Sequence, residues 1–313
     1  MPLDPRTFLP TAIDAETAAF NETVEQLIAT QPSITTLEPP VIREARESGA
    51  SLFGPIVRVD SATERQVPGP AGPITLRQFV PETIKGVCLH IHGGGFVLGA
   101  AHHHDVQLST LAARTELVVL SVEYRLAPEH PYPAAPDDCE AAAAWLVANA
   151  AREFGTDRLF VGGQSAGANL AAVTLVRLRD RHRFTGFSGA VLTFGVFDLA
   201  MTPSARRWGD RNLVINTPIM EWFADHYVPA AQRWDPDVSP LYADLQHMPP
   251  AIFTVGTLDP LLDDSLFMHA RWIAAGNRGV LDVAPGGIHG FVAFPLEITR
   301  QANDAIVRFL VSA

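Results

Sequence analysis

Residues 161–168 read Val-Gly-Gly-Gln-Ser-Ala-Gly-Ala, and the rest of the chain is organised around this stretch. The apolar run Leu159-Phe160 precedes it and a helix-forming run at residues 169–173 follows it, so the pattern predicts a buried strand that turns sharply into a helix at Ser165. That is the context of a G-x-S-x-G nucleophile elbow. Gly163 and Gly167 suit such a turn, because it strains the serine backbone and brings neighbouring chain too close for side chains. Many small-residue turns match this motif, so its meaning depends on the rest of the chain.

Composition narrows the class of protein. The 313 residues are 47% hydrophobic and 18% charged, which is enough to bury a large core. A formal net charge of -11 argues against nucleic acid or an anionic membrane as partner, since both would repel this surface. Cys88 and Cys139 lie in apolar patterns that are typical of buried free thiols. Residues 1–5 show no basic or apolar leader pattern and no apolar run reaches membrane-spanning length, so we expect a cytoplasmic protein.

From residue 87 onward, apolar runs alternate with helical patterns. Continuous Val, Ile and Leu runs between helices are typical of strands buried on both faces. We therefore predict the α/β class, and within it a mostly parallel central sheet flanked by helices, with strands at residues 87–91, 117–122, 159–162, 190–194, 251–255 and 280–283. Before these, residues 56–59 and 74–79 alternate in polarity around a Pro-Gly turn at residues 68–72, which predicts two antiparallel strands.

Two segments have helical patterns but no strand. Residues 13–30 predict an amphipathic helix and residues 41–50 a second, shorter one. Residues 198–231 again break the alternation. We assign residues 1–50 and 198–231 to a helical lid, and residues 51–197 and 232–313 to the catalytic domain. The segment 198–231 contains four large aromatic or sulfur-containing residues, Trp208, Met220, Trp222 and Phe223. Their side chains either form the core of this lid or face the substrate.

Acyl transfer by a serine needs a base and a group that orients the base. In a sheet of this kind the expected chain order is serine, acid, histidine, each in a loop after a strand. Asp259 follows the strand at residues 251–255, and His289 follows the strand at residues 280–283. Both positions lie just past the carboxyl end of a strand, where open parallel sheets place their sites. Asp263 and Asp264 are the rivals of Asp259 as orienting acid.

The loop that follows the strand at residues 87–91 reads His92-Gly93-Gly94-Gly95-Phe96. Three consecutive glycines permit backbone N–H groups to point at one spot and leave room for a substrate carbonyl. The loop therefore predicts an oxyanion hole. Together with the elbow, the acid and the histidine, it predicts a catalytic serine.

With these motifs together, the chain resembles the hormone-sensitive lipase family of alpha/beta hydrolases. The resemblance covers about residues 87–313, and it is carried by the elbow, by residues 92–96, by residues 123–129 (Glu-Tyr-Arg-Leu-Ala-Pro-Glu) with 131–135, by residues 259–261 and by residues 289–291. It implies a lid built from the N-terminal segment and from an insertion after the sixth strand.

The resemblance also implies the chemistry. It implies a carboxylesterase for short to medium acyl chains, with a small-molecule ester as substrate and with no cofactor and no metal. The implied nucleophile is Ser165, the base His289 and the orienting acid Asp259. The implied oxyanion N–H donors are Gly94, Gly95 and Ala166.

One position beside the nucleophile departs from the family pattern. Such elbows commonly read Gly-Asp-Ser-Ala-Gly-Gly, whereas this chain has Gln164 for the acid and Ala168 for the last glycine. Neither change removes an atom of the triad, so we hypothesise that Gln164 tunes substrate preference. The predicted substrate pocket comprises Phe96, Gln164, Trp208, Leu213, Met220, Phe223 and Ile288.

Other polar residues receive supporting roles. His92, Glu123, Tyr124 and Arg125 are predicted to brace the glycine loop rather than to transfer protons. The run His102-His103-His104-Asp105 resembles a metal-binding tract, but adjacent histidines on a helix point in different directions. We therefore predict a helix start there, with one histidine under the glycine loop and no metal.

The alternatives to a carboxylesterase are an amidase, formamidase or deacetylase on the same triad and, more remotely, a non-catalytic small-molecule receptor. The triad is common to the enzymes, so the residues leave that choice open, whereas the presence of His289 speaks against a receptor. A homodimer is compatible with the family resemblance, but no residue pattern decides it.

Overall fold

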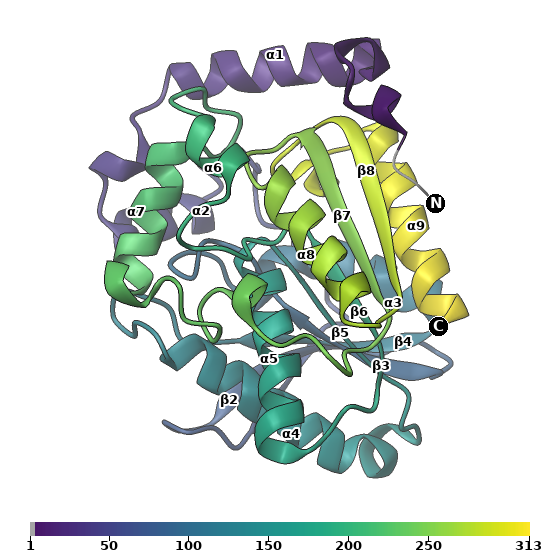
Figure 1. Ribbon diagram of the computed structural model, residues 1–313. Helices are drawn as coiled ribbons and strands as arrows, with labels where there is room; N and C mark the ends of the chain where they lie inside the picture. Colours follow the sequence, from purple (N-terminus) through teal and green to yellow (C-terminus); the bar gives the residue numbers. More distant parts are fainter. Residues whose placement is uncertain (1–3) are drawn as a thin grey trace.

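The computed structural model describes residues 4–313 of the chain; the first three residues of the predicted lid segment 1–50 lie outside this range. An eight-stranded sheet runs through the molecule in the order β1-β2-β4-β3-β5-β6-β7-β8. β1 and β2 pair antiparallel, as do β2 and β4, and every later pair is parallel. The predicted α/β class and mostly parallel sheet are confirmed (Figure 1).

The strands occupy the apolar runs of the sequence. Their bounds are β1 Thr63–Val67, β2 Ile74–Phe79, β3 Gly86–Ile91, β4 Leu117–Glu123, β5 Leu159–Gln164, β6 Phe187–Thr193, β7 Ala251–Leu258 and β8 Gly279–Ile288. Every residue of β3 is buried, and so are the first six of β4 and the first five of β5, as expected for central strands covered on both faces. Cys88 and Cys139 are buried free thiols, as predicted.

The first predicted strand was misplaced. Residues 56–59 form no strand; β1 begins at Thr63 and pairs with β2 across the predicted turn at residues 68–72. The apolar residues at 56–59 misled the prediction because Val57 is exposed and the Val59 amide donates to Asp105 Oδ2 at 2.9 Å. β1 is an edge strand in which only Val67 is buried, so its sequence shows no apolar alternation.

Helices cover both faces of the sheet. Among those that contact its strands are α3 Asp105–Thr115, α4 Ala134–Phe154, α5 Ala166–His182, α8 Leu262–Ala274 and α9 Glu297–Ser312. α4 packs against α5, and α3 packs against α9 (Figure 1). Within residues 4–313, no helix is both long and apolar enough to cross a membrane.

The two strandless segments are helical in the structure. The N-terminal one contains α1 Ala15–Ala29 and α2 Pro39–Glu47, and the segment after β6 contains α6 Pro203–Arg207 and α7 Thr217–Tyr227. Figure 1 shows these four helices gathered on one side of the molecule. α1 is joined to β8 by the Asn21 amide, which donates to Gly286 O at 2.8 Å. The division of the chain at residues 50, 198 and 231 stays a prediction.

Candidate active site

Ser165 lies at the junction of β5 and α5. Its backbone is held at φ 56° and ψ -120°, a left-handed conformation that a residue with a side chain rarely adopts. The Ser165 amide donates to Thr193 O at the end of β6 (3.0 Å), and Ser165 O accepts from Ala168 N (3.0 Å) in the first turn of α5. The strained turn is therefore held from both sides, and the hydroxyl is left free for other partners.

The glycines of this elbow have no room for a side chain. A Cβ at Gly167 would lie 2.0 Å from Ile91 O, and a Cβ at Gly163 would lie 2.4 Å from the carbonyl carbon of Gly167. The start of α5 thus packs directly on the backbone of β3. This contact explains why positions 163 and 167 are glycines.

Two side chains from distant parts of the chain are linked to Ser165, one directly and one through the other. His289 Nε2 lies 3.0 Å from Ser165 Oγ, and His289 Nδ1 lies 2.9 Å from Asp259 Oδ2. Asp259 directly follows β7 and His289 directly follows β8, whose strands are neighbours in the sheet. Asp259 is 1% exposed and also accepts from Leu261 N at 2.9 Å. The structure thus brings together the serine, histidine and aspartate that the sequence singled out.

The rival acids have other partners. Asp263 Oδ2 accepts from Ser204 N at 2.8 Å, which joins α8 to α6. Asp264 is fully buried and accepts from Phe197 N, Asp198 N and the Thr202 hydroxyl at 2.7, 2.9 and 2.6 Å. The histidine therefore contacts Asp259 and neither rival.

The glycine loop reaches the same place. Gly94 (φ 122°) and Gly95 (φ 61°) adopt conformations that favour glycine, and a Cβ at Gly93 would lie 3.4 Å from Ser165 Cβ. Ala166 is the first residue of α5, so its amide has no acceptor within the helix. In the part of the chain that the structure describes, no protein acceptor takes a hydrogen bond from the amides of Gly94 and Gly95. These amides are available to an oxygen atom beside Ser165.

The four residues predicted to support the glycine loop, His92, Glu123, Tyr124 and Arg125, have different contacts in the structure. Tyr124 donates from its hydroxyl to His92 O at 3.0 Å and stacks on the His92 ring at 4.2 Å, so it supports the glycine loop as expected. His92 Nδ1 lies 2.8 Å from Gly93 O, and burial lowers the pKa of His92 to about 3, which keeps its ring neutral. Glu123 instead accepts from Ala101 N at 2.7 Å, and Arg125 pairs with Asp138 of α4. Only the support by His92 and Tyr124 is direct.

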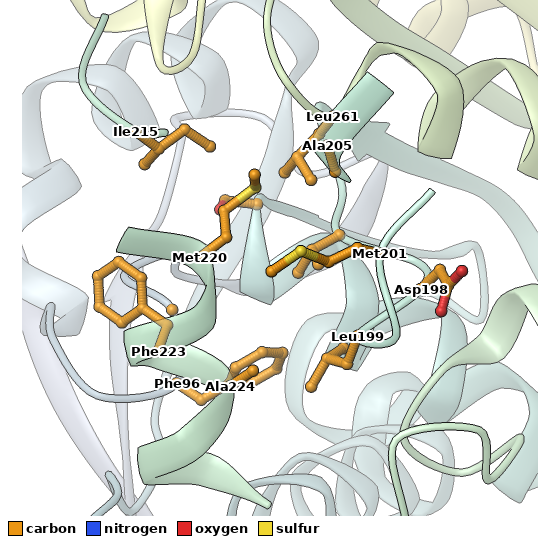
Figure 2. A pocket seen from close by; sticks show the side chains of 13 residues that line it. Phe96, Asp198, Leu199, Met201, Ala205, Ile215, Met220, Phe223, Ala224 and Leu261 are labelled. Atoms are coloured by element: carbon orange, nitrogen blue, oxygen red, sulfur yellow. The ribbon is translucent and has the colours of Figure 1, made fainter. Parts of the chain in front are cut away.

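An apolar pocket opens beside Ser165. Most of its wall comes from the segment after β6 and from α7, as Figure 2 shows for Met220, Phe223 and Ala224. The Phe96 ring stacks on Tyr227 at 3.9 Å, and a Cβ at Gly95 would collide with the Phe223 ring at 2.3 Å. The pocket is lined by Gly95, Phe96, Ser165, Val196, Asp198, Leu199, Met201, Ala205, Ile215, Met220, Phe223, Ala224 and Leu261.

Three predicted pocket residues, Phe96, Met220 and Phe223, belong to this wall, and four do not. Leu213 and Ile288 are buried in a separate apolar cluster with Phe194 and Phe291, and Trp208 packs against that cluster. Gln164 ends β5 and pairs with Thr193 of β6. Trp208, Leu213 and Ile288 were chosen for being apolar, whereas packing directs their side chains into the other cluster. Gln164 was chosen because it neighbours the nucleophile.

The sequence did contain a signal for the pocket residues that were missed. Val196, Asp198, Leu199 and Met201 follow the carboxyl end of β6, the same kind of position that identified Asp259 and His289. Asp198 is the one acid in the wall. Its carboxylate accepts from the Tyr242 hydroxyl at 2.8 Å, and burial raises its pKa.

The histidine run marks a helix start, as predicted, but two of its side chains point to the same partner. Residues 101–104 form a 3₁₀ turn before α3, and His104 is directed to Gln107 at 3.3 Å, with its ring 5.5 Å from that of His90. His102 and His103 do not point in different directions, because both reach Glu47 at the end of α2. The partner lies 55 and 56 residues earlier in the chain, so local spacing could not reveal it.

Comparison with known proteins places the chain among hydrolases. The family described as the alpha/beta hydrolase fold matches residues 88–293. The carboxylic ester hydrolase LipN of Mycobacterium tuberculosis is 37% identical over 253 residues, which is 77% of this chain and 67% of that protein. The esterase LipI of the same organism is 35% identical over 269 residues, 79% of each chain. The solved structure of a hyperthermophilic esterase from Pyrobaculum calidifontis superposes with a TM-score of 0.84 at 32% identity, covering 100% of this chain and 99% of that one.

Proposed function

Because the chain belongs to the alpha/beta hydrolase family, within the hormone-sensitive lipase group that its motifs resemble, we propose that it is a serine carboxylesterase. The observation that carries the proposal is the His289 ring, which contacts Ser165 Oγ at 3.0 Å on one side and Asp259 Oδ2 at 2.9 Å on the other. The names of the matched relatives support ester hydrolysis as the reaction.

The geometry supports an acyl-enzyme mechanism. Ser165 Oγ attacks the ester carbonyl while His289 Nε2 accepts the hydroxyl proton. Asp259 accepts a hydrogen bond from Nδ1–H and so keeps Nε2 free as the base. The carbonyl oxygen becomes negative in the tetrahedral intermediate and accepts from the amides of Gly94, Gly95 and Ala166. His289 then gives its proton to the leaving alcohol, and water repeats the sequence on the acyl-enzyme.

The pocket wall supports a short to medium acyl chain as the substrate group. Its side chains beside Ser165 are almost all apolar, and Phe223 lies directly over Gly95. An acyl chain bound there leaves water and contacts Met220, Phe223 and Leu261. A long chain would have to displace Phe223 or leave the pocket.

The test is a chain-length series of p-nitrophenyl esters from acetate to palmitate. We expect kcat/KM to be highest for short to medium chains and to fall for the longest. Ser165→Ala should lower kcat by roughly a thousandfold or more on every ester. Near-wild-type hydrolysis by Ser165→Ala would overturn the proposal, and a preference for p-nitroacetanilide over p-nitrophenyl acetate would favour an amidase.

A second variant tests the pocket. Phe223→Ala should raise the relative kcat/KM for longer chains by about tenfold or more, since each methylene that gains a place in an apolar pocket contributes roughly 1–3 kcal/mol. Trp222→Ala is the matched control, because Trp222 neighbours Phe223 on α7 but does not line the pocket. An unchanged chain-length profile in Phe223→Ala would show that the acyl chain binds elsewhere.

A further inference from the structure

Glu47, His102 and His103 converge at a point where α2 meets the 3₁₀ turn Ala101–His104. His102 Nε2 lies 2.9 Å from Glu47 Oε1, and His103 Nε2 lies 2.7 Å from the same oxygen. The two imidazole rings stand almost perpendicular, at 84°, with their centroids 4.6 Å apart. Two nitrogens and one carboxylate oxygen thus face a common centre, and the proposed ester cleavage uses none of them.

The backbone holds the two histidines in place. The Ala101 amide donates to Glu123 Oε2 at 2.7 Å, and the His103 amide donates to Ala100 O at 3.1 Å. The side chains of His102 and His103 are only 16% and 8% exposed, whereas that of Glu47 is 45% exposed. The nitrogens are therefore fixed, and the carboxylate lies on the side open to solvent.

The chemistry of the cluster suits a metal ligand set. In the structure His102 Nε2 and His103 Nε2 lie within hydrogen-bond distance of Glu47 Oε1, a carboxylate oxygen that can only accept, so each Nε2 carries a hydrogen there. To bind a metal through Nε2, each neutral ring would carry its hydrogen on Nδ1 instead. The guanidinium of Arg58 lies 3.9 Å from Glu47 Oε2, but this arginine is 57% exposed and can turn into solvent. Glu47 Oε1 contacts both histidines, whereas Oε2 contacts His102 at 3.2 Å and has Arg58 at 3.9 Å.

We propose that Glu47, His102 and His103 bind a zinc ion through Oε1 and the two Nε2 atoms, with water as the fourth ligand. The three ligand atoms lie within 4.8 Å of one another. Zinc bonds of about 2.0–2.2 Å in a tetrahedral site put neighbouring ligand atoms roughly 3.3–3.5 Å apart. The nitrogen–oxygen contacts of 2.9 and 2.7 Å therefore need to open by roughly 0.4–0.8 Å, which a half-exposed carboxylate at a helix end can supply. Imidazole ligands favour zinc over magnesium or calcium, which prefer oxygen.

A zinc ion here would clamp two parts of the chain that meet next to the glycine loop. α2 already contacts that region through Arg43, which donates from Nε to Val97 O at 2.8 Å and from Nη2 to Ala127 O at 2.7 Å. The metal adds a second link, from the end of α2 to the turn that follows the glycine loop. Its effect is on the stability of this contact, because a ligand that binds only the folded chain stabilises it.

The test is calorimetric titration of chelator-treated protein with ZnCl₂ at pH 7.5. We expect one saturable equivalent in the wild type. Glu47→Gln, His102→Gln and His103→Gln should each weaken zinc binding at least tenfold. His182→Gln is the matched control, because His182 Nε2 also contacts a glutamate, Glu140, at 2.9 Å but has no second histidine beside it. MgCl₂ should give no saturable binding.

Two further readouts separate binding at this site from binding elsewhere. Cobalt(II) should give the visible absorption of a tetrahedral nitrogen–oxygen site in the wild type and not in His103→Gln. Zinc should raise the melting temperature of the wild type and of His182→Gln, but not of His103→Gln. Metal-free circular dichroism and basal ester hydrolysis, expected to be unchanged, verify that each variant is folded.

Either of two results would overturn the proposal. One is the absence of a saturable equivalent in the wild type. The other is wild-type zinc affinity in all three ligand variants, which would place the ion at another site. If one variant misfolds, the remaining two decide.

Discussion

At the scale of single residues, the contact between His289 and Asp259 determines which nitrogen of the imidazole can act as base. Asp259 Oδ2 faces Nδ1, and Oδ1 is held by Leu261 N. A carboxylate at this position can only accept, so it fixes the proton on Nδ1 and leaves Nε2 free to face Ser165. In the proposed mechanism, the role of Asp259 is thus to select the tautomer of His289.

Asp259→Asn should lower kcat by about ten-thousandfold with little loss of stability, because the amide can donate to Nδ1 and stabilise the wrong tautomer. Steady-state kinetics on p-nitrophenyl butyrate measure the change. Asp263→Asn is the control, since Asp263 contacts Ser204 and not the histidine, and it should keep most of the activity. Equal losses in the two variants would contradict this assignment.

Asp264 is a buried acid whose pKa lies far from its ordinary value. Burial raises its pKa to about 8, while three donors face its carboxyl oxygens. Below the unfolded pKa of roughly 3.9 the group is protonated in both states. Between that value and about 8, the unfolded chain releases the proton while the folded chain retains it, so rising pH favours unfolding.

Asp264→Asn should remove this pH dependence, because its amide does not titrate and its oxygen can still accept from the two backbone amides. Thermal or urea unfolding at pH 5 and pH 8.5 measures it. The quantity of interest is the free energy of unfolding of the wild type minus that of Asp264→Asn. This difference should be smaller at pH 8.5 than at pH 5. A difference that stays constant, or that grows, would mean that Asp264 is ionised in the folded state.

At the scale of elements, the elbow works because β3, β5 and α5 approach more closely than side chains allow. The motif predicted that side chains have no room at positions 163 and 167. It did not predict which part of the chain takes up that room, which at Gly167 is the backbone oxygen of Ile91 in β3. A motif can show that a position has no room for a side chain. Which strand lies against that position depends on the order of the strands in the sheet. That order places β3 next to β5 although β4 lies between them in the sequence.

Gly167→Ala should therefore destabilise the protein by roughly 3 kcal/mol or more, because the new methyl group meets a rigid backbone oxygen. Gly155→Ala is the control. Gly155 has a φ of 71° but open space around its Cβ position, so its substitution should cost only about 1–2 kcal/mol. Urea unfolding of the two variants compares them directly, and a smaller loss in Gly167→Ala than in Gly155→Ala would contradict the packing argument.

The elements that carry the pocket were harder to predict. Residues 198–231 were recognised as a helical segment, and four pocket residues were predicted there: Trp208, Leu213, Met220 and Phe223. Only Met220 and Phe223 line the cavity. An apolar residue in a helix can face the core or the substrate, and the sequence pattern is the same for both. The two roles separate only when the neighbouring helices and β6 are in place.

At the scale of the whole molecule, the site depends on loops after four strands of one sheet. The glycine loop follows β3, Ser165 follows β5, Asp259 follows β7 and His289 follows β8. The strand runs and their order along the chain were readable from the sequence, so the fold class and the meeting of these residues could be predicted. An edge strand without apolar alternation, such as β1, could not be predicted, and neither could a contact away from the strand ends, such as that of Glu47 with His102 and His103.

The central claim is that this assembly makes Ser165 a nucleophile, and covalent labelling tests it most directly. Treatment of the folded protein with diisopropyl fluorophosphate, followed by peptide mass spectrometry, should show one adduct on Ser165 that forms in parallel with the loss of esterase activity. The adduct should be absent from Ser165→Ala and from protein unfolded in urea, where β7 and β8 no longer bring Asp259 and His289 to the serine. Full esterase activity without an adduct on Ser165, or an inactivating adduct on another residue, would contradict the account.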